Sequence, residues 1–129
     1  MICENRKYPR IIPETNVFAA LGYGNTFAGK INDISIGGLS FEHIVSMDKK
    51  VNFANVIDIF VPETNFYLAD VRCRKVYDLP VRQDNSFTTP FVLKRCGVKF
   101  EMLARRQMHE LEDFLRYYVR EPGKSYGTA

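Results

Sequence analysis

The fold is decided around one short stretch, DISIGG at residues 33–38, which joins two strand-like runs, 26–34 and 39–44. Asp33 and Ser35 are two residues apart, so on an extended chain both side chains point to the same face. Gly37 and Gly38 allow a ligand to approach the backbone closely. The stretch therefore predicts a small polar recognition patch or, more simply, a turn, because Asp, Ser and Gly are all common turn residues.

Short strand-like runs separated by turn residues extend in both directions from this stretch. This pattern favours an antiparallel barrel or sandwich over alternating strands and helices. Turns are expected at 22–25 and 62–65, a polar connection at 46–52, and a longer loop at 79–90 that holds two prolines. The six predicted strands are 17–21, 26–34, 39–44, 56–61, 66–77 and 91–100.

The periodicity changes once, near the C-terminus, where an apolar stripe at helical spacing predicts one amphipathic helix over 102–120. A Pro-Gly pair follows the helix and ends it, and residues 121–129 form a polar tail. The helix is expected to pack on or beside the barrel. The apolar stripe consists of Met108, Leu111, Phe114, Leu115 and Tyr118.

Length and composition limit the classes of function. The chain has 129 residues, which corresponds to one domain of ordinary size and leaves no room for a two-domain enzyme. Hydrophobic residues make up 46% and charged residues 26%, as in a folded protein with a real core. The net charge of +3 is too small for bulk binding of a polyanion, so any basic function must be local.

Membrane spans, disulfides and metal sites are not expected. No apolar run approaches the roughly 18 residues of a membrane span, and we expect a cytoplasmic protein. Cys3, Cys73 and Cys96 are odd in number and far apart, which rules out a full disulfide framework. The two histidines, His43 and His109, lack the spacing of a metal-binding helix, so no metal or cofactor is predicted.

A basic cluster lies near the N-terminus, in RKYPR at residues 6–10. Pro9 disfavours a helical conformation at Tyr8, so Arg6, Lys7 and Arg10 are expected on an extended or looped segment. Arg forms bidentate pairs with phosphate or with a guanine edge, and its flat face stacks on bases. The simpler interpretation is a solvated basic terminus.

The two motifs differ in how often they are expected by chance. By chance, Arg-x-x-x-Arg is expected about 0.75 times in this composition, whereas [Asp/Asn]-x-Ser-x-x-Gly is expected only about 0.03 times. In this order, the motifs resemble those of the PilZ domain, the bacterial receptor module for the second messenger cyclic di-GMP. The resemblance covers nearly the whole chain, including the end of the last strand, 96–100, and the helix after it.

The resemblance implies a mostly β fold, a six-stranded antiparallel barrel with a C-terminal α-helix. It implies a non-catalytic effector that changes conformation on binding cyclic di-GMP and signals to a protein partner, as monomer or homodimer. The expected parts are a ligand-binding segment (1–12), a barrel (13–101), a helix (102–120) and a tail (121–129). The implied ligand-binding residues are Arg6, Lys7, Arg10, Asp33, Ser35, Gly37 and Gly38.

Three other functions are alternatives to this one. A small barrel that binds single-stranded nucleic acid fits the seventeen aromatic residues, ten Phe and seven Tyr. A protein-interaction module without a ligand is disfavoured because both motifs are intact. An enzyme with Ser35 as nucleophile is not expected, since the first glycine of the Gly-x-Ser-x-Gly elbow is missing.

Overall fold

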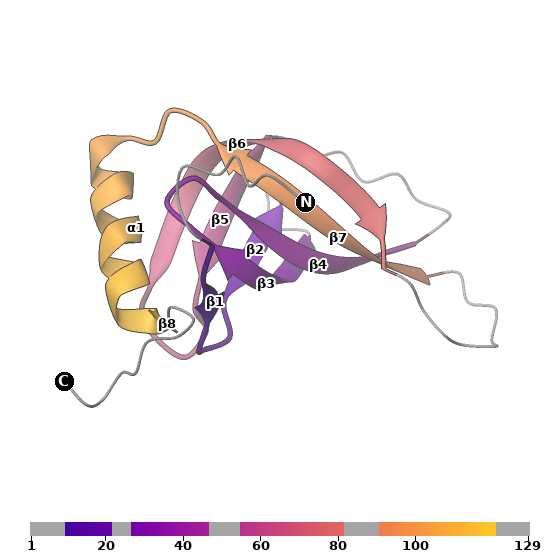
Figure 1. The fold of residues 1–129 in the computed structure, drawn as a ribbon, viewed down its shortest axis with the longest axis horizontal. Helices are drawn as coiled ribbons and strands as arrows, with labels where there is room; N and C mark the ends of the chain where they lie inside the picture. Colours follow the sequence, from indigo (N-terminus) through magenta and orange to yellow (C-terminus); the bar gives the residue numbers. More distant parts are fainter. Residues whose placement is uncertain (1–9, 22–26, 47–54, 82–90, 121–129) are drawn as a thin grey trace, which may run out of the picture.

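Six strands close into an antiparallel barrel in the computed structural model, which describes residues 10–21, 27–46, 55–81 and 91–120 (Figure 1). Around the barrel the strands follow the order β2-β3-β4-β7-β6-β5. The prediction of a six-stranded antiparallel barrel with a C-terminal helix is confirmed. The barrel strands are β2 (Phe18–Leu21), β3 (Phe27–Ile34), β4 (Gly38–Ser46), β5 (Val56–Phe60), β6 (Tyr67–Pro80) and β7 (Phe91–Phe100).

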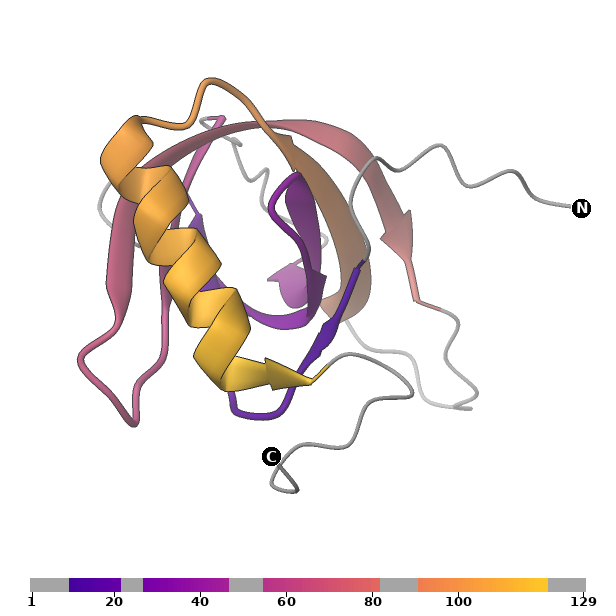
Figure 2. The same cartoon turned by 60° about the vertical axis from the view of Figure 1, so that its left-hand side comes forward.

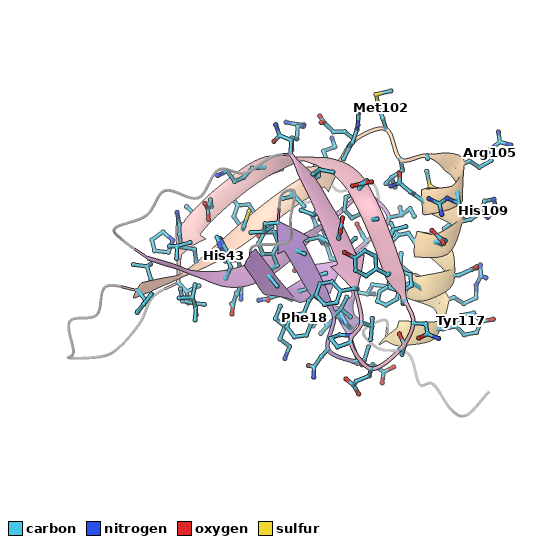
Figure 3. All side chains as sticks on the ribbon, turned by 180° about the vertical axis from the view of Figure 1, so that it is seen from behind. Phe18, His43, Met102, Arg105, His109 and Tyr117 are labelled. Carbon is cyan, nitrogen blue, oxygen red and sulfur yellow. The ribbon has the colours of Figure 1, made fainter. Side chains whose placement is uncertain are left out.

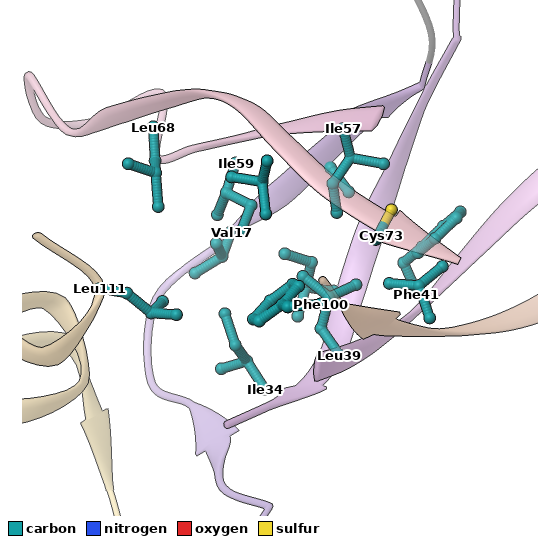
Figure 4. Packing of buried hydrophobic residues seen from close by; sticks show 14 of the residues in the cluster. Val17, Ile34, Leu39, Phe41, Ile57, Ile59, Leu68, Cys73, Phe100 and Leu111 are labelled. Atoms are coloured by element: carbon teal, nitrogen blue, oxygen red, sulfur yellow. The ribbon is translucent and has the colours of Figure 1, made fainter. Parts of the chain in front are cut away.

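Alternate residues of each barrel strand fill the interior, as a period of two requires. On β4, Leu39 and Phe41 are fully buried and lie opposite Val98 and Cys96 of β7. Figure 4 shows Leu39 and Phe41 among the aliphatic side chains of this core. Removing these apolar surfaces from water is the main favourable contribution to folding.

The helix α1 (Arg105–Tyr118) lies across one mouth of the barrel (Figure 2). Leu111 and Phe114 are buried, and the Phe114 ring stacks on Phe66 with centroids 4.7 Å apart. On its other side the helix is exposed, as Figure 3 shows for Arg105 and His109. Of the predicted apolar stripe, Leu111, Phe114 and Leu115 therefore pack on the core, whereas Met108 is exposed.

Gln107 fixes where α1 begins. Its side-chain oxygen accepts a hydrogen bond from the backbone N–H of Ala104 at 2.9 Å, the reciprocal half of a capping box. Its amide nitrogen donates to the carbonyls of Ala69 and Asp70 at 2.9 and 3.0 Å, which attaches the helix to β6. Met102 has a positive φ of 49°, so the helix begins at 105 and not at the predicted 102.

The helix also ends earlier than predicted. After residue 118 the chain forms β8 (Val119–Arg120), which pairs with β1 (Ile12–Pro13) in a separate two-stranded sheet. The predicted end at residue 120 is therefore wrong. The cause is a pairing between residues more than a hundred positions apart, which no local periodicity reveals. The predicted tail, 121–129, lies outside the described residues.

Two strands are longer than predicted. Leu79 and Pro80, expected in a loop, belong to β6 and pair with Arg95 and Lys94 of β7. A proline is tolerated there because β5 does not pair with this end of β6, so the position lies at a sheet edge. Strand β4 continues to residue 46, where a polar connection was expected. The rest of that connection and of the loop, with the turn at 22–25, lies outside the described residues.

The two described cysteines are small core residues. Cys73 and Cys96 are free thiols in the interior, and burial raises their pKa values to about 12 and about 11. Cys3 lies outside the described residues. No group of three His, Cys, Asp or Glu that could hold a metal occurs within the described ranges, and no helix there is long and apolar enough to cross a membrane.

One polar cluster faces inward, on β4, β6 and β7. His43 (labelled in Figure 3) is buried against the Phe41 ring, and its Nε2 lies 3.7 Å from Oδ1 of Asp78. Lys75 and Lys94 approach the other oxygen of Asp78, at 3.5 and 3.3 Å. Burial lowers the pKa of His43 and outweighs the opposing effect of the Asp78 charge, so the ring is neutral in the folded protein.

His43→Gln removes this titration and leaves Asp78, Lys75 and Lys94 in place. The unfolded chain takes up a proton at the usual histidine pKa of about 6.5, whereas the folded protein does so only at lower pH. We therefore expect the wild type to lose free energy of unfolding, relative to the variant, as the pH falls through about 6.5. Urea denaturation at a series of pH values measures this difference. A difference that stays constant with pH would contradict the assignment.

Candidate functional site

The two sequence motifs meet on the outer surface of the barrel, where the N-terminal segment passes the end of β3. Arg10 Nη1 donates to Oδ1 of Asp33 at 3.0 Å and so joins residues 23 positions apart. The two side chains are 21% and 31% exposed, so solvent screens this ion pair less than a fully exposed one. A cation and a carboxylate are thus held side by side at the surface.

A backbone bridge sets this geometry. The N–H of Ile11 donates to the carbonyl of Ile34 at 3.0 Å, and the N–H of Ile34 donates back to the carbonyl of Ile11 at 2.9 Å. Both side chains are buried in the core. Because neighbouring side chains on extended backbone alternate, the inward position of Ile11 directs Arg10 outward, next to Asp33.

A β-bulge directs Asp33 outward. The register between β3 and β4 shifts between Ile31 and Asp33, which inserts one extra residue into β3. Ile31 and Ile34 are both in the core, and the two residues between them, Asn32 and Asp33, make polar contacts. The Asn32 amide donates to Glu42 at 3.0 Å. Without the bulge, strict alternation would point Asp33 into the barrel.

The turn after β3 is held by the Ser35 side chain. Its hydroxyl accepts from the N–H of Gly37 at 3.0 Å and is directed at the carbonyl of Gly38 at 3.4 Å. The carbonyl of Gly37 accepts from the N–H of Phe100, which attaches the turn to the end of β7. Ser35 is buried while Asp33 is partly exposed, so the two do not form the expected shared face. The residues after Ile34 turn instead of staying extended, and a ligand contact of Ser35 remains a prediction.

Gly38 is required by close packing. A Cβ there would lie 2.3 Å from the carbonyl oxygen of Val98 and 3.3 Å from Nη2 of Arg10. Gly38 therefore allows β4 to pair closely with β7 and leaves room for the Arg10 guanidinium.

The outer face continues from Asp33 across the barrel. Ser40 lies directly opposite Asp33 on one side and opposite Gly97 on the other. The Tyr77 ring covers Gly97, where a Cβ would lie 2.2 Å from the ring. Sequence analysis missed Ser40 and Ile11. Strand alternation around Ser40 was an available signal, but nothing local indicated the bridge at Ile11.

A second ion pair borders this face. Arg95 Nη2 lies 2.7 Å from Oε2 of Glu42, and this hydrogen bond is the main reason that the pKa of Glu42 lies below its usual value. Glu42 is therefore ionised and has Asn32 and Arg95 as partners. Of the two carboxylates on this face, Asp33 is the one held by Arg10.

Five of the seven predicted site residues lie in the described part of the chain, and the structure brings them together around the β3–β4 turn. Arg10 and Asp33 offer charged groups, and the others form the turn. Arg6 and Lys7 lie outside the described residues. The five are Arg10, Asp33, Ser35, Gly37 and Gly38.

Comparisons with known proteins agree on the fold. A family model for the PilZ domain matches residues 4–117. The PilZ domain of YcgR from Escherichia coli with c-di-GMP superposes with a TM-score of 0.60 at 13% identity, covering 88% of this chain and 90% of that one. MrkH, a c-di-GMP-dependent transcription regulatory factor, gives 0.59 at 15% identity, covering 89% of this chain and 51% of that one. No curated protein matches the sequence.

Gly38→Ala tests the packing of the site. The added Cβ meets the backbone of β7, which cannot rotate away, so we expect the free energy of unfolding to fall by about 1 to 3 kcal/mol. Gly97→Ala is the matched control, because the added Cβ meets the ring of Tyr77, which can move. The free energy of unfolding should therefore fall by less in Gly97→Ala than in Gly38→Ala. Urea denaturation measures both. A Gly38→Ala variant as stable as the wild type would refute this packing.

Proposed function

Because this chain belongs to the PilZ domain family, we propose that it is a cytoplasmic effector that binds cyclic di-GMP around the Arg10–Asp33 pair and passes the signal to a protein partner. One observation carries the proposal: the cation of one motif and the carboxylate of the other are hydrogen-bonded to each other at 3.0 Å.

The ion pair suits a ligand that can replace both of its halves. A phosphate of cyclic di-GMP can take the place of Asp33 at the guanidinium fork of Arg10. The N1–H and N2–H₂ groups of a guanine can take the place of Arg10 at the carboxylate of Asp33. Neither charged group is then left without a partner when the ligand enters, which avoids the main penalty for disrupting a partly buried pair. A single cyclic dinucleotide supplies both groups.

Arg6 and Lys7 are proposed as further ligand-binding residues. Arg6 precedes Arg10 by four residues, and extended chain spans at most about 3.6 Å per residue, so Arg6 lies within about 14 Å of Arg10. Both residues can therefore reach one dinucleotide. In the proposed complex the segment before the Ile11–Ile34 bridge folds over the ligand, and its arginines pair with phosphates and stack on guanines.

The proposed signal has a short route to the other end of the chain. The two residues after Ile11, Ile12 and Pro13, pair with Arg120 and Val119 at the end of α1. A change in the backbone at Arg10 is therefore separated from the C-terminal segment by two residues. This connection supports signalling by conformational change.

The proposal includes no catalytic step. The Ser35 hydroxyl is engaged in the turn, and His43 faces the barrel interior with a lowered pKa, away from the outer surface that carries Asp33. Ser35, Gly37 and Gly38 are proposed to contact the ligand from the turn that also presents Asp33.

Binding of single-stranded nucleic acid has one observation in its favour. Phe18, Phe60 and Tyr67 form a stacked row on β2, β5 and β6, with successive ring centroids 5.8 Å apart. Such rows can stack on bases, but they are also ordinary cross-strand pairs. An RNA complex that cyclic di-GMP does not displace would support this alternative.

Isothermal titration with cyclic di-GMP tests the proposal. Arg10→Ala and Asp33→Ala should each weaken binding by more than about tenfold. The first removes the proposed partner of a phosphate, and the second removes the proposed partner of a guanine. Arg116→Ala is the matched control, since Arg116 forms an exposed pair with Asp113 on α1 and should bind like the wild type. Absence of heat at tens of micromolar ligand, with folded protein, would refute the proposed function.

A further inference from the structure

The Ser40 hydroxyl is buried and has no hydrogen-bond partner among the described residues. The residue is 2% exposed. Buried hydroxyls in folded proteins are nearly always paired, and an unpaired one lowers stability. Ser40 is therefore either a defect of the fold or a group that a ligand completes.

Ser40 lies on the face that carries the site. Its neighbours Leu39 and Phe41 are fully buried in the core, so alternation along β4 directs Ser40 to the outer face of the barrel. It pairs with Asp33 across the β3–β4 ladder. In an antiparallel sheet, opposite residues have Cβ atoms only about 4.5 to 5.5 Å apart. A ligand group bound to Asp33 is thus within reach of Ser40.

Two side chains lie over the positions around Ser40. Arg10 bonds to Asp33 through Nη1, and its Nη2 lies 3.3 Å from the Cβ position of Gly38. On the opposite side, Tyr77 covers Gly97. Neither Arg10 nor Tyr77 forms a hydrogen bond with the Ser40 hydroxyl. If a phosphate draws Arg10 away from Asp33, the carboxylate and the Ser40 hydroxyl become available together.

We propose that Asp33 and Ser40 together recognise the base edge of one guanine of the ligand. Asp33 accepts hydrogen bonds from N1–H and N2–H₂, and the Ser40 hydroxyl donates to O6, the next group along the same edge. This assignment rests on the proposed function and names the residues that give it base specificity. A site built from such groups discriminates strongly, because the wrong base leaves buried polar atoms unpaired.

The alternatives on the page fit this role less well. The hydrogen of Ser35 is already directed at Gly38, so Ser35 has none to offer to O6. Adenine presents an acceptor at N1, which opposes the carboxylate of Asp33, and a donor at the position of O6. The carboxylate of Asp33, which can only accept, therefore selects guanine over adenine, and the Ser40 hydroxyl adds a hydrogen bond to the selected base.

Calorimetric titration of Ser40→Ala tests the assignment. We expect the variant to bind cyclic di-GMP about tenfold more weakly than the wild type, which corresponds to one charge-free hydrogen bond. Cyclic di-IMP keeps O6 and lacks the 2-amino group. Its affinity should therefore also be about tenfold lower for the variant than for the wild type. Thr64→Ala, which deletes a hydroxyl in the exposed turn before β6, should leave binding unchanged.

The free energy of unfolding provides a second test, because Ser40→Ala should lower the affinity for the ligand without lowering the stability of the free protein. The free Ser40→Ala protein should be at least as stable as the wild type to urea, because it loses an unpaired hydroxyl. Ser35→Ala should be less stable, because it loses the bonds of the turn. Wild-type affinity in Ser40→Ala, or a loss of its stability, would overturn the assignment. If the wild type itself binds no cyclic di-GMP, the proposed function fails and this assignment fails with it.

Discussion

The site depends on two backbone hydrogen bonds between Ile11 and Ile34. They attach the N-terminal segment to the end of β3, bury Ile11 in the core and leave Arg10 outside, next to Asp33. The next two residues continue into the pairing with the end of α1. The proposed ligand site, the barrel and strand β8 therefore meet within four consecutive residues, 10–13. A displacement of this short segment affects all three.

The polar groups around this bridge differ in how many of their hydrogen bonds are already made within the protein. The Ser35 hydroxyl is engaged in the turn, and Glu42 is paired with Asn32 and Arg95. Within the part of the chain that the structure describes, Arg10 and Asp33 are paired with each other, and in the proposed complex a phosphate and a guanine replace both partners at once. The proposed site is thus a pair of charges that would exchange partners when the ligand binds. Such a site binds without any strongly basic surface, in keeping with a net charge of +3.

Most of the barrel could be predicted from periodicity, because each strand has one buried face. The bounds of β7, 91–100, agree with the prediction. Prediction from local periodicity failed where contacts between residues far apart in the sequence determine the local structure. The turn after Ile34 breaks the alternation that placed Asp33 and Ser35 on one face, the bulge in β3 sets the face that Asp33 takes, and β8 forms by pairing with β1. Ser40 was predictable in principle, because its neighbours Leu39 and Phe41 mark the inward positions of β4.

The most direct test of the account is an NMR titration of the amide signals with cyclic di-GMP. We expect the largest shifts at residues 33–38, at Ile11 and at Phe100, whose N–H is bonded to the turn. The amide signals of α1 around His109, on the side of the helix that faces away from the barrel, should shift little. Shifts concentrated on the row of Phe18, Phe60 and Tyr67, with none at the turn, would contradict it.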